Sequence, residues 1–352
     1  MTAPHVVDLA TVKSQQQTVG DSLHPVTSVE VTVLLDNTVD ILLPSSEVVR
    51  RPPLLPDAFD RPALRAEHGY SALITVDGGP SVLYDAGISK DGAAHNLSVL
   101  DVAPTDLRAV VLSHGHADHH GGLEGLLPML GRPRLPLLLH PDAWRQRRLV
   151  FPTGTEVRLP PPSQADLAAE GVEVVEERGP SLLLDGHLLI TGQTERCTPF
   201  EQGLPGQQAL VDGNWEPDPW TWDDQAVVVN VSGRGLVVVS GCSHSGAVNV
   251  MVAARRQTGV TAICAFVGGM HLAGPVFEPI IPQTVAAVHE LAPEFLVPGH
   301  CTSWRAQAAM ATALPDAYVA STVGTTLRFE ATSTINDAHH TSTTPGNHTK
   351  DQ

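Results

Sequence analysis

The chain has 352 residues, of which 42% are hydrophobic, so it carries enough apolar mass for a buried core and is not a wholly disordered protein. Its 38 acidic residues outnumber its 21 Lys and Arg residues and give a formal net charge of −17. This charge repels phosphate backbones and argues against a general nucleic-acid binder, but it permits a small anionic ligand, because a bound metal reverses the local field.

The sequence contains no apolar run long enough to cross a membrane, and residues 1–25 lack the apolar stretch of a Sec-type signal peptide. We therefore expect a cytoplasmic protein with a small-molecule substrate and no membrane partner, and homo-oligomerisation stays open. Four cysteines are too few for a disulfide scaffold in a chain of this length. They are Cys197, Cys242, Cys264 and Cys301. Two of them stand in Gly-, Ser- and His-rich strand ends, which indicates site chemistry.

Composition divides the chain into three parts. Residues 1–28 are polar and aperiodic and predict a loose arm, whereas residues 331–352 are rich in Thr, His and Asn and predict a disordered tail. We expect one domain over residues 29–330, because no long linker and no internal repeat interrupts this stretch. The histidines of the tail are therefore not counted as ligands: His339, His340 and His348.

Short apolar and β-branched runs predict a series of strands. In chain order these are 29–36, 71–76, 81–84, 109–112, 135–140, 172–175, 181–184, 187–190, 226–231, 235–240, 262–267 and 295–297. Helical periodicity predicts helices over 123–130, 246–257, 282–291 and 303–312. The strand pairs within 172–184 and 226–240 predict hairpins around Gly-containing turns. Because strands come first and helices close each half, a layered α/β sandwich is favoured over a barrel.

The strongest chemical signal is the segment Ser-His-Gly-His-Ala-Asp-His-His-Gly-Gly at residues 113–122. It follows the predicted strand 109–112 directly and precedes an amphipathic helix. Neutral imidazoles and a carboxylate at a strand end can converge on one or two divalent cations. The candidate ligands in this segment are His114, His116, Asp118 and His119.

The spacing His-x-His-x-Asp-His at a strand–helix junction resembles the metallo-β-lactamase superfamily. The resemblance implies an αββα four-layer sandwich with the metal site at one edge of its two sheets. It also implies that Asp85 orients the site from behind the ligands and that His300 is the last metal ligand. Cys242 stands where the family has an aspartate that bridges two metals, and because a thiolate can ligate zinc we still expect a metal ligand at this position.

The middle histidine ligand of the family has no direct counterpart, since no histidine lies between His187 and His244. Two substitutes stay open. Either a carboxylate of the Trp-Asp-Asp-Gln segment at 222–225 takes the position, or His244 supplies the imidazole from the far side. His244 follows a predicted ligand strand, so we count it as a metal or catalytic group, beside the alternative of a structural histidine in a turn.

A closer resemblance covers about residues 30–305. Seven short motifs occur together in order and resemble the subgroup named for the archaeal dihydropterin-methyl-ribofuranosylaminobenzene-phosphate synthase: Asp36-Asn37-Thr38, Glu67-His68-Gly69, Ser113-His114-Gly115-His116, Thr198-Pro199-Phe200-Glu201, Gly241-Cys242-Ser243-His244, Gly268-Gly269-Met270-His271-Leu272 and Pro298-Gly299-His300-Cys301-Thr302. The motifs are highly specific for membership of the subgroup. They are much less specific for the reaction after which the subgroup is named, because fold and family do not fix a substrate.

Further residues are candidates for a substrate pocket. His271 follows an apolar strand. It is either a structural histidine that caps the strand or a pocket group that touches substrate or metal, and His68 is likewise either structural or part of the pocket. The segment 192–224 is too long for a plain connection and predicts an irregular, lid-like insertion that stacks a flat ring and pairs an anionic group. The alternative is a surface loop of self-packed tryptophans. The pocket candidates here are Arg196, Glu201, Trp215, Trp220, Trp222 and Asp224.

These residues together predict a metal-dependent hydrolase of an ester, amide or phosphoester, with Asp118, His244 and His271 as catalytic candidates. One or two divalent metal ions would make water a nucleophile at neutral pH, with zinc expected first and iron or manganese as alternatives. The alternative activity is a transferase, in which the metals clamp a dihydropterin-methyl diphosphate while a ribofuranosylaminobenzene phosphate-like acceptor attacks. A third hypothesis is a non-catalytic metal- or ligand-binding protein.

Overall fold

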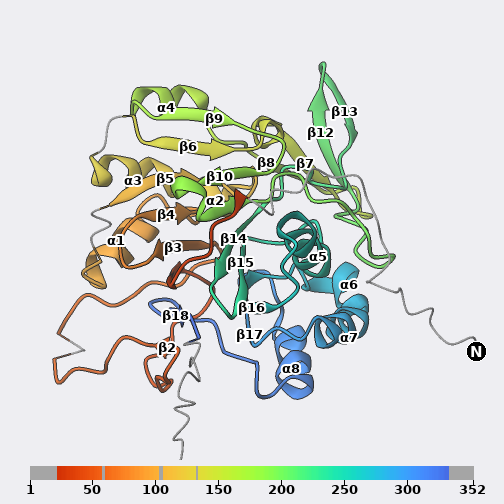
Figure 1. Cartoon of the computed structure of the whole chain (residues 1–352). Helices are drawn as coiled ribbons and strands as arrows, with labels where there is room; N and C mark the ends of the chain where they lie inside the picture. Colours follow the sequence, from red (N-terminus) through yellow and green to blue (C-terminus); the bar gives the residue numbers. More distant parts are fainter. Residues whose placement is uncertain (1–21, 58–59, 103–105, 132–133, 333–352) are drawn as a thin grey trace, which may run out of the picture.

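The computed structural model describes residues 22–57, 60–102, 106–131 and 134–332, and its strands form three sheets (Figure 1). An eight-stranded sheet has the order β2 (Val49–Arg50), β18 (Thr326–Glu330), β1 (Ser28–Leu35), β3 (Ser71–Val76), β4 (Ser81–Tyr84), β5 (Leu107–Val111), β6 (Pro136–Leu139) and β9 (Glu173–Glu176). A six-stranded sheet has the order β10 (Ser181–Leu183), β11 (Leu188–Ile190), β14 (Ala226–Val231), β15 (Gly235–Ser240), β16 (Ile263–Gly269) and β17 (Phe295–Gly299). A four-stranded sheet consists of β13 (Asn214–Pro217), β12 (Gln207–Val211), β7 (Arg147–Val150) and β8 (Glu156–Leu159).

Helices connect and cover these strands. They are α1 (Gly92–Val99), α2 (Ala117–His120), α3 (Leu123–Leu130), α4 (Gln164–Ala169), α5 (Ala247–Thr258), α6 (Gly274–Phe277), α7 (Ile281–Leu291) and α8 (Trp304–Ala313), with 3-10 turns η2 (Pro141–Trp144), η3 (Leu184–Gly186) and η4 (Glu278–Ile280). None of the helices in the described part of the chain combines the length and the apolar character that a membrane span requires.

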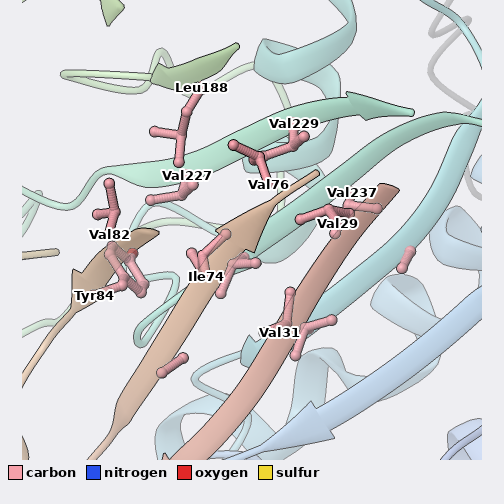
Figure 2. Close-up of a cluster of buried hydrophobic side chains, with 14 of the residues drawn as sticks. Val29, Val31, Ile74, Val76, Val82, Tyr84, Leu188, Val227, Val229 and Val237 are labelled. Carbon is pink, nitrogen blue, oxygen red and sulfur yellow. The ribbon is translucent and has the colours of Figure 1, made fainter. Parts of the chain in front are cut away.

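Side chains of the two large sheets meet in one apolar layer (Figure 2). Val29 and Val31 of β1 and Ile74 of β3 lie in this layer with Val227 and Val229 of β14, and each is at most 1% exposed. Alternate residues of each strand enter the layer, because successive side chains of a strand point to opposite faces. Each such side chain contributes about 1.5–3 kcal/mol by its burial, so this layer holds the sheets face to face.

Helices cover the outer faces of both sheets. On the eight-stranded sheet, α1, α3 and α4 bury Leu97, Leu126 and Leu167 against the strands. On the six-stranded sheet, α5 and α8 bury Met251 and Met310, and α7 packs beside them. The layers therefore follow the order helix, sheet, sheet, helix, which confirms the αββα sandwich.

The four predicted helices are present as α3, α5, α7 and α8, each within one residue of its predicted bounds. Left-handed glycines end two of them, Gly131 after α3 and Gly259 after α5, as expected for a residue without a Cβ atom. The hairpin predicted within 226–240 is also confirmed, since β14 and β15 pair antiparallel.

The hairpin predicted within 172–184 is wrong. β9 pairs in parallel with β6 in the eight-stranded sheet, whereas β10 pairs with β11 in the six-stranded sheet. The short link between β9 and β10 thus carries the chain from one sheet to the other. Hydrophobic periodicity identifies a strand but not its partner, which explains the error.

Two further segments differ from expectation. The insertion at 192–224, expected to be irregular, contains the hairpin of β12 and β13, which joins β7 and β8 in the third sheet. Asp212 and Gly213 turn this hairpin with φ of 49° and 82°, and Asp-Gly is the dipeptide that such two-residue turns prefer. Residues 22–27 of the predicted arm lie against the six-stranded sheet, where Val26 is 1% exposed. The rest of the arm and the predicted tail from residue 333, with its three histidines, lie outside the described residues.

Candidate metal centre

Five predicted site residues follow the ends of strands that pair in parallel. β4 pairs in parallel with β5 in one sheet, and β15, β16 and β17 pair in parallel in the other. Because parallel neighbours end at the same edge of a sheet, the residues after them come together. These residues are Asp85, His114, Cys242, His271 and His300.

Three imidazoles from the two sheets meet at this edge. His114 Nε2 lies 3.0 Å from His116 Nδ1, which in turn lies 3.1 Å from His244 Nε2. Burial lowers the pKa of all three rings, that of His116 to about 4, so they are neutral at physiological pH. Neutral imidazoles are the form that ligates a metal. Of the two alternatives left open for the middle histidine, His244 is the one whose ring lies beside His114 and His116.

The carboxylates of Asp223 and Asp224, which were the alternative to His244, make no hydrogen bond to these rings. Asp223 Oδ2 accepts the backbone N–H of Gly115 at 2.8 Å and pairs with Arg147. Asp224 Oδ2 accepts the backbone N–H and the hydroxyl of Ser245. Both carboxylates thus hold the backbone around the ligands, in the loop before His116 and in the turn after His244.

Hydrogen bonds from neighbouring side chains hold the candidate ligand rings in their orientations. Asp85 Oδ1 accepts the N–H of Ser113 at 2.7 Å, and Asp85 Oδ2 lies 2.7 Å from both the Ser113 hydroxyl and His119 Nδ1. On another side, Gln207 Oε1 lies 2.9 Å from His116 Nε2. The Gln207 amide nitrogen donates to two other oxygens, so its own oxygen faces the ring. His116 Nε2 therefore carries the proton, and Nδ1 is left for a metal.

A second group surrounds the Asp118 carboxylate. Its Oδ2 lies 3.3 Å from His300 Nε2 and 3.7 Å from both His119 Nε2 and His68 Nε2. Burial raises the pKa of Asp118, but His119 and His300 outweigh this effect and hold the pKa well below its usual range. Burial likewise opposes the charged form of His119, yet Asp85 and Asp118 raise its pKa to about 9. Asp118 is therefore ionised and has the charge that a cation attracts.

Cys242 lies between the two groups of side chains. Its Sγ belongs to three sets of ligand atoms that lie within 4.8 Å of one another: with His114 and His119, with His244 and His271, and with His300 and Cys301. Sequence reasoning did not include Cys301 among the ligands. The available signal was its place directly after His300, at the end of a predicted strand.

The donor set fits a divalent cation. Within the described part of the chain, His119 Nε2, His244 Nδ1 and His300 Nδ1 are buried without a hydrogen-bond partner. Such atoms are rare in folded proteins, because each loses its hydration without compensation. Imidazole nitrogens, a carboxylate and thiols are also the ligands that zinc and neighbouring transition metals take. The residues present therefore suit one or two metal ions.

His271 and His68 flank the cluster. The His271 ring is tilted by 47° against that of His244, with 4.1 Å between the centroids, and its Nδ1 lies 3.5 Å from Cys242 Sγ. The His68 side chain is 66% exposed and stacks on His300 at 5.0 Å. Both therefore contact candidate ligands, which supports the pocket interpretation of each over a purely structural one.

The aromatic residues of the 192–224 segment pack mainly on arginines. Trp215 of β13 lies under the guanidinium of Arg148 at 4.4 Å, and Trp222 lies under that of Arg196 at 4.9 Å. Trp220 and Trp222 have ring centroids 6.1 Å apart. Arg196 also donates to the carbonyl oxygens of Thr194 and Trp220, so the group expected to pair an anion already has partners within the segment.

The Glu201 side chain lies against the N-terminus of α5, behind the turn that carries His244. Its carboxylate accepts the backbone N–H groups of Val248 and Asn249, each at 3.0 Å, and the Thr198 hydroxyl at 3.0 Å. Burial raises the pKa of Glu201 to about 7 against these hydrogen bonds. Glu201 is 5% exposed, and its hydrogen bonds hold the first turn of α5 in place behind the site.

Comparison with known proteins agrees with this architecture. A protein of Methanocaldococcus jannaschii named 7,8-dihydropterin-6-methyl-4-(beta-D-ribofuranosyl)-aminobenzene-5'-phosphate synthase is 28% identical over 251 residues, which are 69% of this chain and 83% of that protein. A second, uncharacterized protein of the same organism is 26% identical over 68% of this chain and 86% of its own length.

Among solved structures, a protein described as a metal-dependent hydrolase of the beta-lactamase superfamily superposes with a TM-score of 0.64 and 25% identity. The match covers 87% of this chain and 100% of that one. The family model described as "Metallo-beta-lactamase superfamily" matches residues 64–300, which include the ligand candidates from both sheets. The chain therefore belongs to the metallo-beta-lactamase superfamily.

Proposed function

We propose that this protein is a metal-dependent hydrolase that cleaves an ester, amide or phosphoester bond of a small substrate. The observation that carries the proposal is the convergence of His114, His116 and His244, whose facing nitrogens lie 3.0 and 3.1 Å apart. Burying three neutral imidazoles with their nitrogens facing one another does not stabilise the fold by itself. Each of these nitrogens would have a lower free energy in water or in a hydrogen bond to a protein oxygen.

In this proposal His114, His116 and His244 hold one cation. Asp118, His300 and His119, the last after release of its Nε2 proton, hold a second. A bound divalent cation supplies Lewis acidity, which makes water nucleophilic at neutral pH and polarises a carbonyl or phosphoryl oxygen. Zinc is the first expectation for the metal, with iron or manganese as alternatives.

The chain's own residues would orient the reactants and move the proton. Asp118 is ionised and 18% exposed, so its carboxylate can accept a proton from the attacking water. His271 lies beside His244 at the half-buried rim and is placed to pass a proton to a leaving group. Asp85 and Gln207 keep the ligand rings in their orientations throughout.

A transferase is the second candidate, favoured by the 28% identity to the archaeal synthase over 83% of that protein's length. In that reaction a diphosphate leaves a dihydropterin-methyl group, and a ribofuranosylaminobenzene phosphate-like acceptor takes its place. The tryptophans near Arg196 would then stack the pterin ring, and the same metal ligands would serve both reactions.

Metal analysis combined with a product screen tests the proposal. The purified protein should carry one or two transition-metal ions per chain, and mass spectrometry should detect hydrolysis of ester, phosphoester or diphosphate substrates only in the metal-loaded form. Condensation products from a diphosphate and an arylamine acceptor would favour the synthase instead. Metal bound in a closed shell with no product in either screen would favour a binding protein, and full activity without metal would overturn both reactions.

A further inference from the structure

Two thiols meet at the edge of the six-stranded sheet. Cys242 follows β15 and Cys301 follows β17, and the intervening strand β16 ends in Gly268 and Gly269. The two sulfur atoms lie 3.1 Å apart. A Cβ atom on Gly269 would lie 2.9 Å from Cys301 Sγ and 3.0 Å from Cys242 Cα. The absence of a side chain at Gly269 therefore lets the thiols approach each other across β16.

Further donors surround this pair. Cys242, His300 and Cys301 form one set of ligand atoms within 4.8 Å of one another. The His300 side chain is fully buried, and its Nδ1 makes no hydrogen bond to any described residue. His271 Nδ1 lies 3.5 Å from Cys242 Sγ. Two sulfurs and two imidazoles are thus gathered in one place.

The Cys301 sulfur faces one backbone donor and one backbone acceptor. Its Sγ accepts the N–H of His271 at 3.2 Å and lies 3.4 Å from the carbonyl oxygen of Cys242. Both cysteines are buried, at 3% and 7% exposure, and neither is in a disulfide. Two adjacent buried thiolates would repel each other unless a cation lay against both.

We propose that Cys301 is a further metal ligand and that Cys242 and Cys301 together supply two thiolate ligands to the candidate metal centre. This inference rests on the proposed metal-dependent function. On binding, each thiol releases its proton to solvent, and no oxidation takes place. Two thiolate ligands of one tetrahedral zinc lie about 3.8 Å apart, given zinc–sulfur bonds of about 2.3 Å, so only a small separation of the sulfurs is needed. A thiolate pair selects zinc, ferrous iron or cobalt over manganese and magnesium, which prefer oxygen ligands.

Cobalt(II) reports sulfur ligands directly, so the test is the absorption spectrum of the full-length protein loaded with cobalt. Wild type should show the sulfur-to-cobalt charge-transfer band in the near ultraviolet. Cys301→Ser should lose about half of its intensity, and so should Cys242→Ser. The remaining cysteines offer matched controls, because Cys264 lies in the core between the sheets and Cys197 contacts Asn249. Cys264→Ala and Cys197→Ser should keep the full band.

Different failures are distinguishable in this experiment. A full band in Cys301→Ser would overturn the role of Cys301. Cobalt that binds to wild type without a charge-transfer band would also overturn it, while the proposed hydrolase centre at His114, His116 and His244 would stand. A wild type that binds no cobalt and no zinc would contradict the proposed function itself.

A measurement on wild type guards against a variant that fails to fold. Zinc should protect Cys242 and Cys301 from alkylation, as read by peptide mass spectrometry, and a chelator should remove the protection of both together. Cys197, which is only half-buried, should react at the same rate with and without zinc. Equal alkylation of Cys301 with and without bound zinc would contradict the proposal.

Discussion

Several site residues adopt a left-handed backbone conformation that non-glycine residues usually avoid. The φ angles are 58° at Asp85, 58° at Ser243, 48° at His271 and 47° at His300. Each costs about 1–3 kcal/mol and persists only where surrounding contacts hold it. At His300 the contact is visible, since Asp36 Oδ1 accepts its backbone N–H at 2.7 Å. The sharp turns at the strand ends aim the side chains into the cluster.

His116→Ala should remove metal without unfolding the protein. His116 contacts His114, His244 and Gln207 through its ring nitrogens, so its loss removes a donor and not core packing. We expect metal content to fall at least tenfold at limiting metal, with an unchanged circular dichroism spectrum. His120→Ala is the matched control, because the His120 ring bonds the carbonyl of Pro160 outside the cluster and should leave metal content intact. Wild-type metal content in His116→Ala would refute the ligand assignment.

Glu201 should make stability depend on pH. Burial raises its pKa to about 7, above the usual value of an unfolded glutamate, so the folded state binds the proton more tightly. Stability from this group therefore increases as pH falls from about 7 to about 4.5 and is lost again as pH rises through 7. The effect is at most about 3 kcal/mol, from a pKa difference of about 2.5 units.

Glu201→Gln cannot titrate, so wild type should gain stability over this variant between pH 8 and pH 5 in urea unfolding. The exposed Glu195 provides the control, and Glu195→Gln should follow the wild-type pH profile. Parallel pH profiles for wild type and Glu201→Gln would show that the buried carboxyl does not titrate in this range.

At the scale of elements, the four-stranded sheet supports the metal centre from outside the sandwich. β12 supplies Gln207, which bonds the His116 ring. β7 supplies Arg147, which is 1% exposed and pairs with Asp218 at 2.8 Å and Asp223 at 2.6 Å. Asp223 in turn accepts the N–H of Gly115 between the first two histidines. This sheet therefore connects to the ligand loop at two points.

Gln207→Leu should weaken metal binding about 10- to 100-fold, because the His116 ring loses the acceptor that fixes its tautomer. A competition titration with a chromophoric chelator measures this affinity. The neighbouring Gln208 pairs with Arg148 instead, so Gln208→Leu should bind metal as wild type does. Equal affinities for the two variants would show that β12 does not orient the ligand.

Arg147→Met should lower the free energy of unfolding by about 3–5 kcal/mol, because Asp223 stays buried without its charge partner and Asp218 keeps only Arg145, at 3.6 Å. Denaturant unfolding measures the loss. Arg148 on the same strand pairs with Glu156, whose side chain is 52% exposed, so Arg148→Met should cost about 1 kcal/mol or less. A loss below about 1 kcal/mol in Arg147→Met would mean that the buried network contributes nothing net.

At the scale of the whole molecule, the candidate ligands come from both sides of the sandwich. His114, His116, Asp118 and His119 follow the eight-stranded sheet, whereas Cys242, His244 and His300 follow the six-stranded sheet. A bound cation would therefore link the two sheets at one edge. Such a ligand stabilises the folded state by RT ln(1 + L/Kd), where L is the free metal concentration and Kd its dissociation constant.

Chelation should lower the melting temperature. At a free metal concentration about 100 times the dissociation constant, the metal contributes about 2.7 kcal/mol, so its removal should lower Tm by roughly 4–5 °C in a scanning calorimeter. His116→Ala should respond less to the chelator than wild type does. An identical Tm with and without chelator would show that the metal does not link the sheets.

Much of this protein follows from the sequence alone. Helices α3, α5, α7 and α8 have a clear helical period, and the inner strands are continuous apolar runs, so both are recognisable locally. The strands of the third sheet are less apolar and were missed, although the Asp212–Gly213 turn marks one hairpin. The segment at 113–122 indicates a metal centre because its imidazoles and carboxylate stand at a strand end.

Only the tertiary structure decides which donors meet. The middle ligand stayed open in the sequence between His244 and the carboxylates at 223–224. In the structure the turn after β15 of one sheet and the loop after β5 of the other meet, so that His244 lies beside His116. The contact of Cys242 with Cys301 depends on Gly269 of the strand between them. Local residue patterns determine where a chain carries metal-binding groups, whereas the neighbours of each strand end are set by long-range pairing, which periodicity does not encode.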